Sequence, residues 1–462
     1  MSEDGWRTSI RWVVAHPTEA RVLLAGRDGA LYLPRSERPG QVWTAEPGEV
    51  LPGLRDLLGA DALLLRCLDE HEDPPARVQR ATLLAEPRAL PALPDGLAWA
   101  GRAELAGAAG DGDAALAARV VEELAGPGGG PAGRPWAARG WFAGAERWLH
   151  DAMAAIGRPL TGPVEQVQVW DLSCVLRAPT AAGDVWFKAT AASPLFVNEG
   201  PVMGALAGLF GDRVPAPLAV DPGRGWMVLD DLGEEVGWEA PLEVVEEVVR
   251  AFARLQVEAA AQADRLLAAG CHDRRLDRLA AQARAWLPAI GATGELAGID
   301  DATWLSEDEQ AAVRAVLPQV LAACRELAGH AVPPSLVHGD LHLGNVARGP
   351  AGYRFFDWTD ACVAHPFFDL LTLRRGTGFA GEEGDGELRD RLRAAYLPAW
   401  APFEPPERLA RALQLAVPLG ALHHAVSYRS LVAGMAPPVE SHMAGSTAWW
   451  LRQMLAGLRD LS

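Results

Sequence analysis

Short apolar runs bounded by turn residues recur through the first 98 positions, a pattern typical of β-strands. Four stretches show it: residues 20–35, 40–46, 62–70 and 77–87. The first of them is split by Asp28-Gly29, which predicts a β-hairpin. Residues 48–59 have the composition of a short helix. We therefore expect a small strand-rich α/β domain over residues 1–98.

The pattern changes twice in the next stretch of the chain. Residues 99–135 begin as an Ala-rich helical piece and end in "GPGGGPAGRP". Glycine allows many backbone states and proline stops a helix, so this range is predicted to be a linker. Residues 136–160 then place Trp141, Phe142 and Trp148 near helical spacing, which predicts an amphipathic helix that docks on the next segment of the chain.

Residues 164–233 alternate in strand fashion around one helix. Residues 164–180 and 183–192 predict two strands joined by a Gly-containing turn, and 198–210 predict the helix. Two further strands are expected at 216–222 and 225–233.

Beyond position 239 the pattern is mostly helical. Residues 136–235 and 236–462 are thus expected to form a small sheet lobe and a larger helical lobe with a cleft between them. The predicted fold class is α+β, a two-lobed fold preceded by a separate small α/β domain.

Charge and composition limit the classes of partner that the protein is expected to bind. The formal net charge is −18, and no basic run is present that would overcome the repulsion of a nucleic-acid backbone. No apolar stretch is long enough for a membrane span. The five cysteines are odd in number and widely spaced, which indicates reduced thiols and a cytoplasmic location. The sequence leaves the oligomeric state open.

The chain avoids two residue types almost completely. Lys188 is its single lysine among 42 Lys and Arg residues, and Asn198 and Asn345 are its only asparagines. Such a skew matches GC-rich codon usage rather than a folding requirement. Residues of an avoided type are therefore candidates for chemistry that is hard to replace.

The segment 336–360 carries the most specific chemistry. After an apolar run, His338-Gly339-Asp340 predicts a turn that presents a carboxylate at a loop tip. Asn345 follows five residues later, and a short apolar strand over 353–358 carries Asp357. Two carboxylates and an amide oxygen are donors that suit Mg²⁺ completed by phosphates and water. Asp340 is then free to face an acceptor hydroxyl.

The motif "HGDLHLGN…DW" resembles the catalytic loop and metal-binding strand of the kinase-like aminoglycoside phosphotransferase family. The pattern of that family, H-G-D-x-x-x-x-N followed by D-[FW], is matched by His338, Gly339, Asp340, Asn345, Asp357 and Trp358. The segment "HPFFDLLTL" is similar to the next family segment and places Asp369 on its acidic position. The resemblance covers about residues 160–450.

The resemblance implies roles for the matched residues. Asp340 is the expected catalytic base, and Asn345 and Asp357 are expected to hold Mg²⁺ against the phosphates of ATP or another nucleoside triphosphate. His338 and Asp369 are expected to support the catalytic loop through hydrogen bonds.

Five further residues are expected to bind the nucleotide. Lys188 occupies the position of the strand lysine that pairs phosphates in kinase-like folds, with Glu199 as its carboxylate partner. A lysine ammonium is more compact than a guanidinium, so arginine would not fit there. Ser173 is a candidate phosphate contact in a covering loop that lacks GxGxxG. Leu229 and Asp231 lie in the expected interlobe hinge that meets the adenine.

The implied reaction transfers the γ-phosphoryl group to a hydroxyl of a small molecule, an amino sugar or another cationic or sugar-like acceptor. Segments 365–370, 381–390 and 422–431 are candidates for the acceptor site, although acidic loops are also typical of a solvated surface. A maltokinase-like sugar kinase and a catalytically silent nucleotide-binding regulator are the alternatives. Residues 1–98 loosely resemble a Nudix-like sandwich without its glutamate-rich helix, which favours recognition, capping or packing over catalysis.

Overall fold

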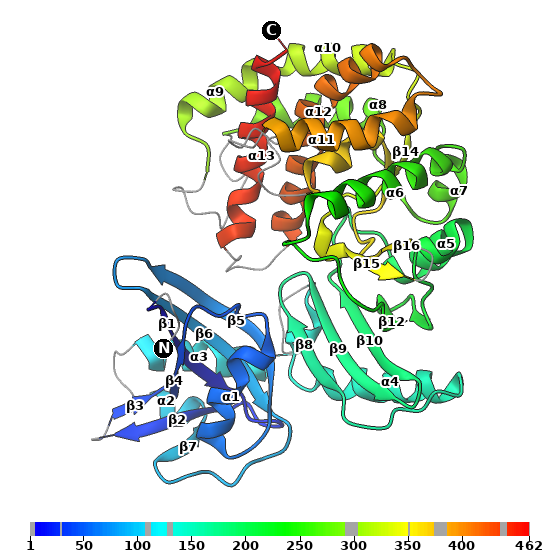
Figure 1. Ribbon diagram of the computed structural model, residues 1–462. Coiled ribbons are helices and arrows are strands. Elements are labelled where there is room, and N and C mark those ends of the chain that lie inside the picture. Colours follow the sequence, from blue (N-terminus) through cyan, green and yellow to red (C-terminus); the bar gives the residue numbers. More distant parts are fainter. Residues whose placement is uncertain are drawn as a thin grey trace. The chain divides into compact units, whose positions relative to one another are not determined.

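The computed structural model combines sheets and helices, as the predicted α+β class requires (Figure 1). It divides into two compact units, of which the first ends at Ala192 and the second begins at Ser193. This boundary differs from the lobe limit expected at residue 235. The described residues are 5–27, 30–106, 112–126, 133–291, 304–349, 352–373, 386–434 and 441–461.

The first unit begins with a strand-rich domain. Its four-stranded sheet has the order β4-β1-β6-β5, and a three-stranded sheet has the order β3-β2-β7. The strands are β1 (Arg7–Val14), β2 (Val22–Arg27), β3 (Ala30–Tyr32), β4 (Arg35–Pro39), β5 (Ala62–Asp73), β6 (Val78–Pro87) and β7 (Leu97–Ala100). The antiparallel pairing of β2 with β3 agrees with the expected hairpin, although Asp28 and Gly29 lie outside the described residues. The expected helix is α1 (Pro47–Leu58).

The strand expected at residues 40–46 is wrong, because the chain forms an irregular loop there. The side-chain amide of Gln79 takes the place of a neighbouring strand. It accepts a hydrogen bond from the Val42 N–H and donates one to the Val42 carbonyl, both at 2.9 Å. A buried side chain can thus satisfy the backbone without a ladder, and the rest of the loop stays available for other contacts.

Much of the range expected to be a linker is folded. Residues 99–126 contain α2 (Arg102–Ala106) and α3 (Gly112–Ala125). Four apolar residues of α3 enter a core shared with the first sheets: Ala117, Val120, Val121 and Leu124. The buried carboxylate of Asp113 accepts hydrogen bonds from the Leu33 N–H and from Arg11. The α3 helix therefore belongs to the N-terminal domain.

The rest of the first unit is an antiparallel sheet with a leading helix. Its strands are β8 (Glu165–Val169), β9 (Ser173–Thr180) and β10 (Gly183–Thr190). The amphipathic helix is α4 (Trp141–Ala155). Trp141 and Trp148 both lie on the ring of Phe187 in β10, with centroids 6.1 and 5.8 Å away. The tryptophan-bearing face of α4 therefore packs on this sheet, as the sequence predicted.

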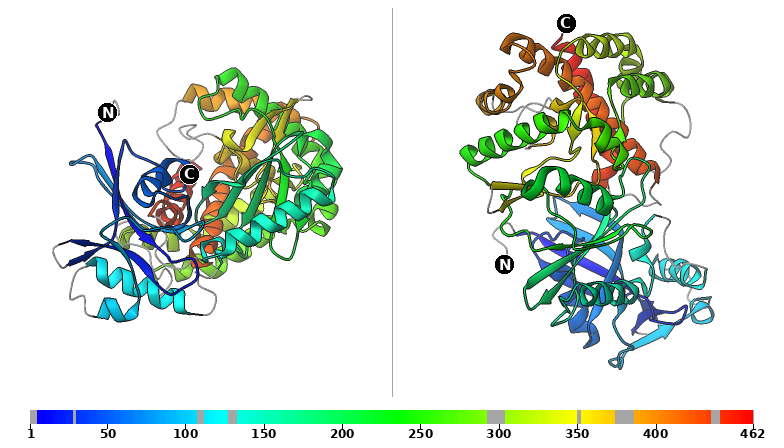
Figure 2. Two further views of the ribbon diagram at one scale, coloured as in Figure 1. Left: turned by 90° about the horizontal axis from the view of Figure 1, so that it is seen from below. Right: turned by 90° about the vertical axis from the view of Figure 1, so that its right-hand side faces the viewer.

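The second unit is mostly helical. It begins with α5 (Glu199–Phe210) and the short antiparallel pair β11 (Ala219–Asp221) and β12 (Trp226–Asp230). Its further α-helices are α6 (Leu242–Ala260), α7 (Ala263–Ala268), α8 (Leu276–Trp286), α9 (Glu307–Ala315), α10 (Leu317–Ala328), α11 (Gly386–Tyr396), α12 (Pro406–Gly434) and α13 (Ser441–Arg459). The last two pack against each other (Figure 2).

Two small sheets of the second unit frame the catalytic motif. The strands β13 (His272–Asp273), β17 (Cys362–Ala364) and β14 (Ser335–Val337) form one, in that order, and β15 (Val346–Gly349) pairs with β16 (Gly352–Phe355). The catalytic motif runs from β14 to β15, and Asp357 comes shortly after β16. None of the described helices is long and apolar enough to cross a membrane.

Candidate active site

The catalytic loop occupies the connection from β14 to β15 and ends in a short 3-10 helix, η4 (Leu343–Asn345). Gly339 adopts a φ of +85°, a region that favours glycine. A Cβ atom on Gly339 would lie 2.6 Å from the Cβ of Asp360 and 2.8 Å from its carbonyl oxygen. The glycine of "HGD" therefore lets the turn lie directly against the segment after Asp357.

The carboxylate of Asp369 holds the start of this loop. It accepts hydrogen bonds from the backbone N–H of His338 at 2.9 Å and of Gly339 at 2.8 Å. The amide of Gln256 in α6 donates a third at 2.9 Å. Burial raises the pKa of Asp369 to about 7, with the two backbone bonds acting against burial and Asp340 adding to it. This is the geometry that the expected supporting role requires.

His338 is a second buried support. Its Nε2 lies 2.8 Å from the Phe356 carbonyl, which can only accept, so Nε2 carries the proton. Nδ1 then accepts from the Asp340 N–H at 3.4 Å. The imidazole thus connects the loop to the segment before Asp357.

Asn345 and Asp357 present oxygen atoms on neighbouring segments. The Asn345 amide nitrogen donates to the Asp340 carbonyl at 2.9 Å, which leaves Oδ1 as its ligand atom. The Phe356 N–H donates to the Asn345 carbonyl at 3.1 Å. Asp357 adopts a φ of +62°, a left-handed conformation that costs free energy in a non-glycine residue and is common at functional sites. Oxygen donors of this kind fit a hard cation such as Mg²⁺.

Glu199 connects this turn to α5. Its side chain is buried in the first turn of the helix, and Oε1 accepts a hydrogen bond from the Trp358 N–H at 3.0 Å. The Val197 N–H also donates to the Thr359 carbonyl at 2.9 Å. Glu199 therefore bonds to the residue directly after the metal-binding candidate Asp357.

Sequence reasoning missed Asp360. Its pKa is raised to about 7 by burial and by repulsion from Asp340 and Asp357, while the buried Arg274 acts in the other direction. Arg274 itself donates to Ser427 at 2.6 Å and to the His423 carbonyl at 2.8 Å. The spacing D-x-x-D after the motif was the only signal of Asp360 in the sequence, and spacing alone gives no burial.

Trp238 was also missed. Its indole stacks on His342 with centroids 4.6 Å apart, and 45% of the side chain stays exposed. Nε2 of His342 lies 3.7 Å from a carboxylate oxygen of Asp340. Trp238 is far from His342 in the sequence and belongs to no motif, so the sequence offered no signal for this aromatic group beside the catalytic loop.

The two predicted hinge residues are Leu229, in β12, and Asp231, in the turn that follows β12. Leu229 is buried in β12, and a carboxylate oxygen of Asp231 accepts from the Gly233 N–H at 2.8 Å. The next segment is fixed to the catalytic loop, because the Val236 N–H donates to the Val346 carbonyl at 2.8 Å. Asp231 therefore shapes the turn that leads from β12 to the catalytic loop.

Lys188 and Ser173 belong to the first unit. Lys188 lies in β10 opposite Val175, and Ser173 begins β9. The buried Ser173 hydroxyl accepts a hydrogen bond from the Trp170 indole at 2.8 Å. Their contacts with phosphate, and that of Lys188 with Glu199, stay predictions.

Several solved structures are similar over about two thirds of the chain. A macrolide 2'-phosphotransferase type I has 16% identity and a TM-score of 0.44, covering 65% of this chain and 95% of its own. A choline/ethanolamine kinase family protein from Mesorhizobium loti has 18% identity and a TM-score of 0.46, covering 69% and 99%. An amicoumacin kinase in complex with AMP-PNP, Ca²⁺ and Ami has 13% identity and a TM-score of 0.41, covering 70% and 100%. No curated protein sequence matches the chain.

A sequence-family model identifies the family of this chain. The model of the phosphotransferase enzyme family matches residues 173–406, just over half of the 462 residues. The match includes the catalytic motif and Lys188, and it confirms the resemblance to aminoglycoside phosphotransferases, the kinase-like fold class and the enzyme class. The chain belongs to the phosphotransferase enzyme family.

Proposed function

We propose that this phosphotransferase uses ATP and Mg²⁺ to phosphorylate a hydroxyl group of a small cationic or sugar-like acceptor. One observation carries the proposal. Within the catalytic loop Asn345 donates to the Asp340 carbonyl, and the Phe356 N–H, next to Asp357, donates to the Asn345 carbonyl and so joins the two segments. A base and two oxygen ligands held together in this way are what phosphoryl transfer requires.

In this proposal Asp340 receives the acceptor proton. The acceptor oxygen forms a bond to the γ-phosphorus as the bond from that phosphorus to the β–γ bridging oxygen breaks, and the hydroxyl proton moves to the Asp340 carboxylate. Asn345 and Asp357 would hold Mg²⁺, which when bound offsets negative charge on the phosphates. The described residues contain no cluster of three His, Cys, Asp or Glu side chains that could hold a metal. Phosphates and water are therefore expected to complete the ligand shell.

The nucleotide assignments rest on the same family resemblance. Lys188 is proposed to contact the phosphates with Glu199 as its partner, and the backbone near Leu229 and Asp231 to meet the adenine. Ser173 remains a weaker candidate, because its buried hydroxyl already accepts from Trp170.

A cationic acceptor fits the electrostatics of the second unit. Besides burial, the nearby carboxylates of Asp340 and Asp357 raise the pKa of Asp360. The chain as a whole carries a net charge of −18. An ammonium group would be attracted to such a site. The exposed face of Trp238 adds a surface on which an alkylammonium or a sugar ring can pack.

An ATP-consumption screen tests the proposal. It compares aminoglycosides, other amino sugars, choline-like amines, maltose and homoserine in the presence of Mg²⁺. We expect turnover with an amine-bearing alcohol, and Asp340→Asn should lower kcat by about 10³-fold, within the range for loss of a general base. Nucleotide affinity should change by less than about three-fold. Maltose as the single active acceptor would favour the maltokinase-like alternative. Nucleotide binding with no turnover of any acceptor would favour the regulator.

A further inference from the structure

The loop Trp170–Leu172 joins β8 to β9, where the phosphate-covering loop is expected. It contains no glycine and carries a carboxylate, Asp171. At its start the Val169 N–H donates to the Ala45 carbonyl of the N-terminal domain at 2.8 Å. The Trp43 ring of that domain meets the Trp170 ring edge to face, with centroids 6.1 Å apart. The irregular loop 40–46 is therefore the part of the N-terminal domain that contacts the covering loop.

Two residues that precede α4 hold the same loop from within the unit. Arg134 forms an ion pair with Asp171, and both side chains are buried. The Trp136 indole donates to the Trp170 carbonyl at 2.9 Å. An acidic side chain in a loop that faces phosphates would repel them. Arg134 supplies the compensating charge.

The loop is also bonded within itself. The Trp170 N–H donates to the Ser173 carbonyl at 3.1 Å, and the Ala191 N–H donates to the Leu172 carbonyl at 2.8 Å. These two bonds, with the bond from the Trp170 indole to the Ser173 hydroxyl, fix the loop on its own strands, and the contacts with Trp43, Arg134 and Trp136 add to them from outside.

The N-terminal domain is joined firmly to this sheet. The side-chain amide of Gln166 in β8 accepts from the Leu64 N–H and donates to the Leu64 carbonyl, both at 2.9 Å. It thus pairs with edge strand β5 as a peptide group would. Arg88 donates to the Val164 carbonyl at 2.6 Å, and its guanidinium lies 4.5 Å from the Phe142 ring centroid.

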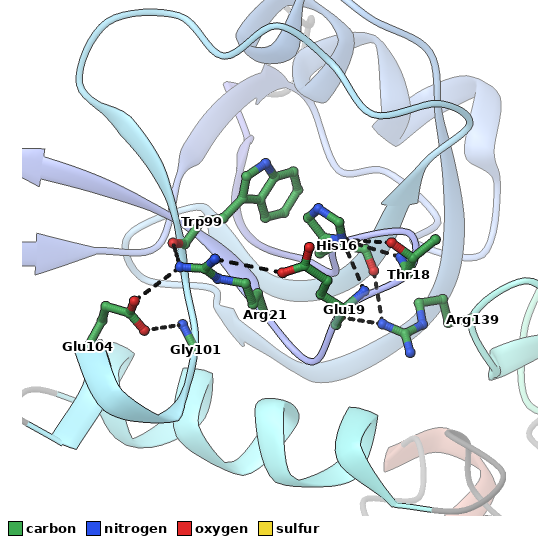
Figure 3. A network of polar contacts seen from close by, with 8 residues as sticks. All are labelled: His16, Thr18, Glu19, Arg21, Trp99, Gly101, Glu104 and Arg139. Carbon is green, nitrogen blue, oxygen red and sulfur yellow. Dashed lines mark hydrogen bonds and ion pairs between the residues drawn. The ribbon is translucent and has the colours of Figure 1, made fainter.

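A second junction lies at the start of α4. Arg139 donates to the His16 carbonyl at 3.0 Å and to the Glu19 carbonyl, which binds it to the β1–β2 turn (Figure 3). His16 shapes that turn, because Nδ1 accepts from the Glu19 N–H at 3.0 Å while its ring packs on Trp99. With contacts just before α4 and along β8, the domain is a fixed support rather than a tethered one.

We propose that the N-terminal domain positions the phosphate-covering loop, with Trp43 and Ala45 holding its entry and Arg134 holding and neutralising Asp171. The proposal rests on the proposed function, because it takes this loop to lie over the nucleotide. In many kinase-like loops glycines let the backbone approach phosphate; here the loop is held by external contacts instead. Trp43 and Arg134 are positioning residues in this scheme.

Three variants test the proposal in the full chain. Trp43→Ala removes the edge-to-face contact from a side chain that is 46% exposed, and Tyr32→Ala is its matched control on the same domain at 38% exposure. Arg134→Met removes the guanidinium that forms the ion pair with Asp171. The readouts are hydrogen–deuterium exchange of a peptide covering 166–176, the Kd for AMP-PNP with Mg²⁺, and the KM for ATP against kcat.

We expect Trp43→Ala to raise exchange in 166–176 and the nucleotide Kd by about five-fold each, the scale of one aromatic pair. Tyr32→Ala should change neither. Arg134→Met should raise the Kd by at least about ten-fold, because a negative charge then faces the phosphates. If Arg134→Met does not fold, exchange in 166–176 and the nucleotide Kd of Trp43→Ala still test the proposal.

Wild-type exchange in Trp43→Ala would overturn the proposal. Faster exchange with an unchanged Kd would overturn it too, since the loop would be held by the domain without acting on the nucleotide. A wild-type protein that binds no nucleotide would instead contradict the proposed function. The exchange measurement would still show whether the domain holds the loop.

Discussion

Two loops of this enzyme are held in different ways. The catalytic loop is fixed from inside the second unit by the buried side chains of Asp369, Gln256 and His338. The covering loop is bonded to its own strands, and the residues that hold it from outside those strands, Trp43, Ala45, Arg134 and Trp136, all precede position 173, where the family match begins. Under the proposal above, the catalytic loop has supports within its own unit, while the covering loop depends on a domain outside the family match.

The difference also lies in the kind of contact. Asp369 gathers three N–H donors at one buried carboxylate, so both backbone bonds at the start of the catalytic loop depend on a single group. The covering loop combines a backbone bond at Ala45, a ring contact at Trp43 and a buried ion pair at Arg134. Loss of one support should therefore be severe for the first loop and graded for the second.

Replacement of Asp369 should have the largest effect. Asp369→Ala removes the acceptor of two buried backbone N–H groups, those of His338 and Gly339, while the Gln256 amide keeps the Leu336 and Pro366 carbonyls. We expect the free energy of unfolding to fall by about 3–5 kcal/mol and activity to be lost. Urea unfolding and a transfer assay measure both. A variant with wild-type stability would show that the catalytic loop does not depend on this carboxylate.

Lys188→Arg tests the proposed contact between Lys188 of the first unit and the nucleotide phosphates. The charge is kept, but the wider guanidinium should not fit a slot between phosphate and Glu199. We expect kcat/KM to fall by about 100-fold, which is about 2.7 kcal/mol. Wild-type kinetics would contradict the size argument and leave the rarity of lysine as a matter of composition.

The stability of the second unit should also be sensitive to acid. Burial lowers the pKa of His365 to about 3 from its usual 6.5, so the folded protein keeps this imidazole neutral. The unfolded chain binds the proton first, and stability is lost as pH falls from 6.5 towards 3. Between about pH 7.5 and pH 5 this one group should lower the free energy of unfolding by about 2 kcal/mol.

His365→Phe should remove that share of the pH dependence. Urea unfolding at the two pH values measures the change, and the wild-type chain is the reference. His424, whose pKa burial also lowers to about 3, keeps its own share in the variant. An unaltered difference between the two pH values would mean that His365 titrates normally in the folded protein.

Gln166→Ala should give the smallest effect and the most local one. It removes two hydrogen bonds between β8 and the edge of β5, a loss of about 1–2 kcal/mol. Exchange at the Leu64 amide should rise together with exchange in the covering loop. Gln168→Ala, two positions along the same strand, is the matched control. Equal changes in both variants would show that β8, rather than its junction with β5, was perturbed.

The sequence located the segments of the candidate site because its signals are local. The fixed spacing from His338 to Asn345 and the later Asp357 identify a loop whose residues act within a few positions of each other. Helix and strand periodicity likewise located α1, α5 and α6. The helical pattern predicted beyond position 239 is interrupted between α9 and α10, where Pro318 cannot donate a backbone N–H.

The sequence did not predict the hydrogen bonds that support the two loops, because these bonds join residues far apart in the chain. Gln256 meets Asp369 across 113 residues, and Gln166 meets Leu64 across 102. Residues 40–46 have the composition of a strand, yet the Gln79 side chain bonds to the backbone of Val42, and Trp43 and Ala45 contact the covering loop and its entry. Arg134 lies in a Gly/Pro-rich stretch that indicates only a linker. Such pairings depend on tertiary packing, which periodicity does not contain.

Hydrogen exchange in a crossed design tests the difference between the two loops most directly. Peptides covering 166–176 and 336–346 are followed in wild type, Trp43→Ala and Asp369→Asn. Faster exchange should be confined to 166–176 in Trp43→Ala and to 336–346 in Asp369→Asn. Equal acceleration of both peptides in either variant would contradict the claim that the two loops have separate supports.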